Sequence, residues 1–114
     1  MENAELPIFK KVHQLYRVFY GYKNIIPKQD RYAIWQRCEN IILDLLENIL
    51  IASLLPRNEK APVLEKTSLK LNALRIFFRL AKDVEAIDHK KYIILEAIID
   101  EIGRMLGGWI RSLK

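Results

Sequence analysis

The sequence predicts an all-α protein, an up-down-up-down antiparallel four-helix bundle formed by one domain over residues 1–114. Three observations support this prediction. First, 51% of the 114 residues are hydrophobic and 29% are charged, which suits one packed core. Second, apolar residues recur at helical spacing, without the period-two alternation of strands. Third, Pro7, Pro27, Pro56 and Pro62, together with the capping residue Asp88, divide the chain into four segments of similar length, and short connections favour antiparallel neighbours.

The first helix is expected over residues 7–25. Pro7 suits the first turn of a helix, where its missing N–H does no harm. Ile26 precedes Pro27, and a residue before proline is steered away from helical angles, so the helix should end there. At about 100° per residue, one side of this helix carries its large apolar side chains, namely Phe9, Val12, Tyr16, Phe19 and Tyr20.

The second helix is expected over residues 30–55, with Asp30 as its N-cap and Pro56 ending it. A polar loop over residues 57–61 should follow. The apolar side of this helix is broad, extending from Tyr32, Trp35, Cys38, Ile42, Leu45, Leu46 and Ile49 round to Leu43 and Leu50. An apolar surplus of this kind on a small domain indicates contacts between subunits.

The third helix, over residues 63–86, has even more apolar surface than one packing seam can bury. Its remaining narrow sector carries Arg75, Arg79 and Lys82, spaced i, i+4 and i+7, so the three cations should project together with no acid between them on that face. A solvated face is the ordinary fate of such charges. A nucleic acid is the alternative, because each cation that meets a phosphate adds salt-dependent affinity, and the stripe would recur in every subunit of an oligomer.

The fourth helix is expected over residues 88–112, with Asp88 as its cap. Gly103 and Gly107 lie within its apolar pattern, and each helix-interior glycine costs about 1 kcal/mol relative to alanine. We expect Gly103 and Gly107, together with Phe77 and Trp109, to lie where another helix or subunit approaches closely. The alternative for the glycines is a frayed or kinked helix end.

No arrangement of residues suggests an enzyme. His13 and His89 lack the neighbours of a nucleophile system, and Cys38 lies on an apolar helix side. No inward Glu-x-x-His pair suggests a metal, and the glycines near residue 105 form no phosphate loop after a strand. We therefore expect no catalytic residue, no metal, no cofactor and no small-molecule substrate.

The overall charge and the single cysteine suggest where the protein works. Nineteen basic residues exceed fourteen acidic ones, which gives a net charge of +5 and favours polyanionic partners. One cysteine cannot form an internal disulfide, so a reducing cytoplasm is expected. Acidic residues interrupt the longest apolar runs, so no membrane crossing is expected.

Three segments resemble the accessory variability determinant (Avd) proteins of diversity-generating retroelements, a four-helix-bundle family related to the 23S rRNA intervening-sequence proteins. The first is Glu101-Ile-Gly-Arg-Met-Leu-Gly-Gly-Trp109. The second is Leu69-Lys-Leu-Asn-Ala-Leu-Arg75, which runs into Arg79-Leu-Ala-Lys-Asp83, and the third is Ile26-Pro-Lys-Gln-Asp-Arg-Tyr32. The resemblance extends over nearly the whole chain.

The resemblance implies a homopentamer with a basic surface that binds the element's reverse transcriptase and template RNA, with DNA as an alternative polyanion. Such a complex supports mutagenic cDNA synthesis, and the accessory protein supplies a scaffold without chemistry of its own. Arg75, Arg79 and Lys82 match the basic positions of the family's third helix, and Arg104 lies in the matching motif of the fourth. The alternative function is that of a structural oligomer of the rRNA intervening-sequence type, without a nucleic-acid role.

Overall fold

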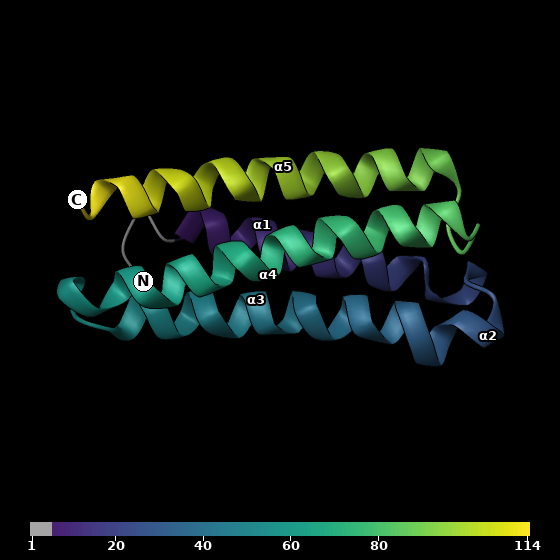
Figure 1. The fold of residues 1–114 in the computed structure, drawn as a ribbon, viewed down its shortest axis with the longest axis horizontal. Coiled ribbons are helices and arrows are strands. Elements are labelled where there is room, and N and C mark those ends of the chain that lie inside the picture. The colour runs from purple at the N-terminus through teal and green to yellow at the C-terminus, as the bar shows by residue number, and fades with distance from the viewer. Residues whose placement is uncertain (1–5) are drawn as a thin grey trace.

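The protein is an antiparallel bundle of four long helices, as a computed structural model that describes residues 6–114 shows (Figure 1). Its long helices are α1 (Leu6–Gly21), α3 (Gln36–Leu54), α4 (Arg57–Asp83) and α5 (His89–Ser112). Both α1 and α4 pack against α3 and α5, so α1 and α4 occupy opposite corners of the bundle. The all-α, up-down-up-down prediction is therefore confirmed, and residues 1–5 of the expected domain lie outside the described residues.

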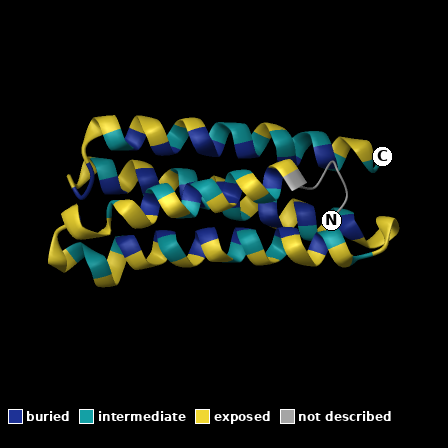
Figure 2. Cartoon of the chain, turned by 180° about the vertical axis from the view of Figure 1, so that it is seen from behind, coloured by how far each residue is buried: buried dark blue, intermediate teal, exposed yellow. Residues whose placement is uncertain are grey.

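Each helix buries one side and exposes the other, which gives the alternating bands of Figure 2. The fully buried side chains are mostly branched aliphatic residues from all four helices, among them Ile8, Leu15, Ile42, Leu45, Ile49, Leu64, Leu74, Leu95, Ile99, Ile102 and Leu106. Near the connection between α1 and α3, Phe19 stacks on Trp35 with 5.0 Å between ring centroids, and the ring centroid of Phe78 lies 5.5 Å from that of Phe19. Burial of this apolar surface is the main force that holds the helices together.

The connection between α1 and α3 is more structured than expected. The first helix ends at Gly21, and a separate 3₁₀ turn covers Lys23–Ile25. After Pro27 the chain forms the short α2 (Lys28–Asp30) and a π-helical stretch, Arg31–Trp35, that leads into α3. The expected capping role of Asp30 is wrong, because the helical segment already begins at Lys28 and the Asp30 side chain makes no capping hydrogen bond.

The expected loop at 57–61 is also wrong, because α4 already begins at Arg57 and contains Pro62. A residue before proline disfavours helical angles, and a proline within a helix removes one hydrogen bond. Contacts with neighbouring helices hold this turn in place. The Lys60 ammonium donates to the Ala52 carbonyl at 2.6 Å and lies 6.0 Å from the Trp109 ring centroid, and Arg57 donates to the Ser112 carbonyl.

The turn from α4 to α5 agrees more closely with the sequence. Helix α4 ends at Asp83, three residues earlier than expected, and Glu85 adopts a positive φ of 64° just beyond its end. The backbone N–H of Ala86 then returns to the Ala81 carbonyl at 2.8 Å. Asp88 caps α5 as predicted, since its carboxylate accepts from the Lys91 backbone N–H at 2.8 Å.

Candidate nucleic-acid interface

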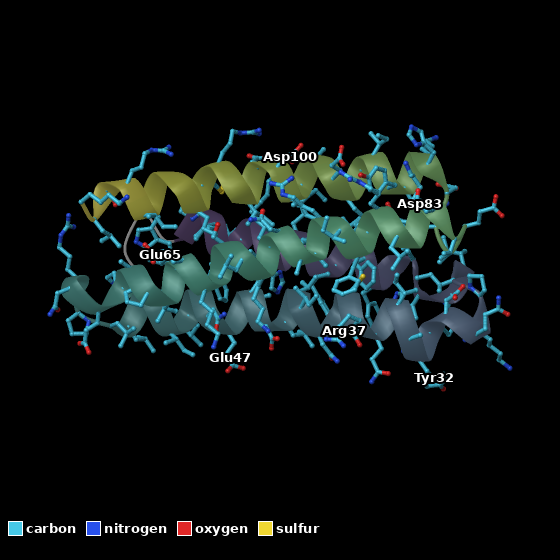
Figure 3. All side chains as sticks on the ribbon, viewed as in Figure 1. Tyr32, Arg37, Glu47, Glu65, Asp83 and Asp100 are labelled. Atoms are coloured by element: carbon cyan, nitrogen blue, oxygen red, sulfur yellow. The ribbon has the colours of Figure 1, made fainter. Side chains whose placement is uncertain are left out.

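The three cations of the predicted stripe lie on the side of α4 that faces α5. Arg75 forms an ion pair with Asp100, which lies midway along α5 (Figure 3). The Lys82 ammonium lies 4.7 Å from the centroid of the Tyr92 ring. The absence of acids from the stripe is therefore a property of α4 alone, because α5 brings a carboxylate to it.

Tyr92, in the first turn of α5, is the residue that the C-terminal part of the α4 stripe contacts. Its hydroxyl donates to the carboxylate of Glu96. That hydrogen bond, followed by desolvation, raises the pKa of the Tyr92 phenol, while Arg79 acts in the opposite direction. Arg79 and Lys82 thus both lie at Tyr92, and Arg79 is an exposed residue.

Farther along the same edge, α4 and α5 border an open groove of about 600 Å³. Arg75, Arg104 and Arg111 line it from both helices, so the predicted residue Arg104 does join Arg75. Arg111 was not among the residues predicted to bind nucleic acid, although it lies seven residues after Arg104, a spacing that returns to the same helix side. The remaining lining residues are Ser68, Leu71, Asn72, Asp100 and Gly103.

The glycines of α5 lie beneath two of these arginines, Arg75 and Arg111. A Cβ placed on Gly103 would lie 2.9 Å from Nη2 of Arg75, and one on Gly107 would lie 3.3 Å from Nη1 of Arg111. A Cβ on Gly108 would lie 3.9 Å from Nη2 of Arg111. Within one chain, the space that the missing side chains leave is therefore taken by guanidinium groups. Whether Gly103 and Gly107 also face another subunit stays a prediction.

The other two residues expected at a subunit contact lie elsewhere. Trp109 is only 8% exposed and belongs to the core of its own bundle. Phe77 is partly buried against that core, with the Arg37 guanidinium 5.9 Å from its ring centroid on the α3 side. The four residues thus do not form one patch on a single chain, and their role in oligomer packing stays a prediction.

A different apolar stripe runs along the outward side of α4. It consists of Leu69, Ala73, Ile76 and Leu80, spaced by four, three and four residues, the spacing of one helix side. Leu69 is 70% exposed and Ile76 is 59% exposed. The adjacent helix α3 adds Leu43, Leu50 and Leu54 to the exposed apolar residues. The sequence predicted a surplus of apolar surface on this helix. Which of its apolar residues face outward could be seen only once the helices were packed together.

The candidate catalytic and metal-binding groups lie apart from one another. His13 lies on the exposed side of α1, His89 begins α5, and Cys38 is buried in the core. Burial raises the pKa of the Cys38 thiol to about 12. Among residues 6–114, no cluster of three or more histidine, cysteine or acidic side chains has the arrangement of a metal site. None of the helices in that range combines the length and apolarity needed to cross a membrane.

Comparison with known families places the chain beside one whose model extends over nearly all of it. The chain matches the bAvd-like family over residues 6–113, which includes all four long helices and both sides of the arginine-lined groove. A comparison with curated proteins gave no significant match.

Proposed function

The chain belongs to the bAvd-like family, and from this premise we propose that it is a non-catalytic accessory protein of a diversity-generating retroelement. In this proposal an oligomer of the chain binds the reverse transcriptase and the template RNA in the cytoplasm and supports mutagenic cDNA synthesis. The family match supports the Avd-type accessory role. The RNA and polymerase contacts are our inference from the charges on α4 and α5.

The observation that carries the RNA part of the proposal is the basic edge shared by α4 and α5. Arg75, Arg79 and Lys82 from α4 and Arg104 from α5 lie along it. Arginine and lysine are the usual partners of phosphate groups, and these contacts give affinity without reading sequence. An oligomer repeats the edge in each subunit, so that weak contacts to one RNA combine.

The apolar stripe on α4 supports the oligomeric part. Monomeric proteins rarely expose a continuous row of large aliphatic side chains, and burial of such a row is a common basis of subunit contact. We propose that the outward side of α4, formed by Leu69, Ala73, Ile76 and Leu80, packs against a second copy of the chain. The pentameric state follows from the family resemblance and stays part of the proposal.

Light scattering of the purified protein, followed by RNA binding across a salt series, tests the proposal. We expect an oligomer whose RNA affinity falls steeply as the salt concentration rises. In a plot of the logarithm of the binding constant against the logarithm of salt concentration, each phosphate contact to a single strand contributes about −0.7 to the slope. The double charge reversal R75E and R79E should abolish RNA binding and capture of the reverse transcriptase while the helical circular-dichroism spectrum is kept. Wild-type binding by that variant would contradict the site.

A control variant separates local charge from total charge. Lys10 and Arg17 lie on the exposed side of α1, away from the α4–α5 edge, so K10E with R17E changes the net charge by the same amount. We expect this variant to keep most of the RNA affinity. An oligomer of wild-type protein that ignores RNA at every salt concentration would instead favour the structural role of the intervening-sequence proteins.

A further inference from the structure

We propose that the groove between α4 and α5 is a phosphate-binding site for the RNA backbone, formed by Arg75, Arg104 and Arg111, and that Gly103 and Gly107 are positioning residues that make room for the guanidinium groups. The inference rests on the proposed function and deepens it. It names the chemical group that is bound, adds Arg111 to the interface, and gives the α5 glycines a role within a single chain.

Arg75 is the most firmly placed of the three arginines. Its Nη1 is paired with Asp100, while Nη2 lies above Gly103, where a Cβ would be only 2.9 Å away. A guanidinium has five N–H donors in a planar fork, so one carboxylate leaves donors for a second anion. The Asp100 contact fixes the plane of the fork, and Gly103 lets it lie against the backbone of α5.

Arg111 and Arg104 complete the positive side of the groove. The Arg111 guanidinium turns back along its own helix, so that Gly107 and Gly108 lie beneath it. Within residues 6–114, the ion pairs of the bundle involve other cations than these two arginines. Three arginines and one aspartate line the groove, a balance of 3 − 1 = +2, which favours an anion.

The rest of the lining favours phosphate over an acidic protein surface. Ser68 and Asn72 add uncharged hydrogen-bonding groups, and Leu71 is the one aliphatic side chain among the lining residues. Specific protein interfaces contain a desolvated apolar centre, whereas phosphates are held by arginine together with serine and asparagine side chains. The groove is also open to solvent, so a polynucleotide backbone can reach its arginines.

Two single substitutions test the site in the protein of residues 1–114. R111A removes an exposed guanidinium, and G103A adds a Cβ that forces Nη2 of Arg75 to move. R17A on α1 is the matched arginine control. G21A is the matched glycine control, because a Cβ on Gly21 has no neighbour within 4 Å. The probe is a fluorescein-labelled single-stranded oligouridylate, measured by fluorescence anisotropy across a potassium chloride series.

We expect R111A to lower affinity about tenfold at low salt, the usual effect of removing one charge-assisted hydrogen bond, and to reduce the salt slope by about 0.7 for each phosphate that is no longer neutralised. G103A should lower affinity in the same direction, and its melting temperature should not fall. A smaller oligomer in G103A would place Gly103 at a subunit contact and would overturn its role at the groove. R17A and G21A should bind like the wild type. A merely structural role for Gly103 would predict the opposite pattern, with reduced stability.

The remaining outcomes overturn the inference in distinguishable ways. If the wild type binds the oligouridylate and both groove variants match it, the groove is not the phosphate site, and the proposed function stands with contacts elsewhere. If the groove variants lose only capture of the reverse transcriptase, the groove binds an acidic protein. If the wild type binds no RNA, the RNA part of the proposed function fails together with the groove.

Discussion

The outward stripe of α4 gives the sharpest prediction about assembly. We expect the double substitution L69Q and I76Q to dissociate the oligomer. Both side chains are more than half exposed, with 70% of Leu69 and 59% of Ile76 open to solvent, so neither contributes much to the core of its own bundle. Glutamine removes the apolar surface without changing the net charge, which leaves long-range attraction of RNA unaffected.

The exposed fractions set the size of the effect. Full burial of a leucine or isoleucine side chain contributes about 1.5–3 kcal/mol. The parts of Leu69 and Ile76 still available for a partner therefore correspond to about 1–2 kcal/mol each. Removing both weakens each interface by about 2–4 kcal/mol, which raises its dissociation constant on the order of 30-fold to 1,000-fold.

Light scattering over a concentration series measures this change directly. The matched control is I25Q, because Ile25 is 57% exposed in the 3₁₀ turn and lies outside the α4 stripe. We expect the control to keep the wild-type mass and the double variant to shift to smaller species, with both keeping their helical spectra. An unchanged mass of L69Q and I76Q at the lowest measurable concentration would refute the assignment of this stripe to the subunit contact.

Three further predictions concern stability and reactivity. Loss of the α5 cap in D88A should lower the melting temperature. Hydrogen bonds from Lys91 lower the pKa of the Asp88 carboxyl, so the stabilisation by Asp88 is present above the unfolded pKa of 3.8 and is lost as the pH falls through the lower folded pKa. Acid titrations of wild type and D88A, followed by melting temperature, measure this difference. Burial raises the pKa of the Cys38 thiol from 9.0 to about 12, so this thiol should resist Ellman's reagent at neutral pH until denaturant is added, and rapid reaction of the native protein would contradict its burial. For the same reason the free energy of unfolding should decline as the pH rises from 9.0 toward 12. In G103A, the helix gains about 1 kcal/mol in propensity and loses at most about 1 kcal/mol from the partly exposed ion pair of Arg75. A thermal melt of G103A should therefore show an unchanged or higher midpoint, and a clear fall would show that the role of Gly103 is structural.

The helical pattern and the cap of α5 could be predicted from the sequence because they depend on nearby residues. Apolar spacing placed four helices, and the cap at Asp88 is formed within one turn of the chain. The start of α4 could not be predicted in this way. Pro62, considered with its sequence neighbours alone, predicts the start of a helix and a loop before it. Residues 57–61 are helical because Lys60 and Arg57 donate hydrogen bonds to carbonyls near the ends of α3 and α5, which lie outside this segment.

The candidate site shows the same division between local and distant information. The spacing of Arg75, Arg79 and Lys82 placed them on one side of a helix, but a single helix cannot say which neighbour that side faces. The role of Gly103 was open for a related reason. Its missing side chain makes room for an arginine that lies on another helix, and no local pattern connects the two.

The π-helical stretch Arg31–Trp35 has a consequence for how such bundles vary in length. A π turn holds one residue more than an α turn, so deleting one residue there would restore regular α-helix while α3 kept its own register. The segments before and after the deletion would keep their relative orientation, because a π turn and an α turn each complete one full rotation around the helix axis. Tyr32 and the short α2 would then keep the direction in which they face. A one-residue difference in chain length at this place can therefore be absorbed without redirecting either end of the molecule and without repacking the four long helices.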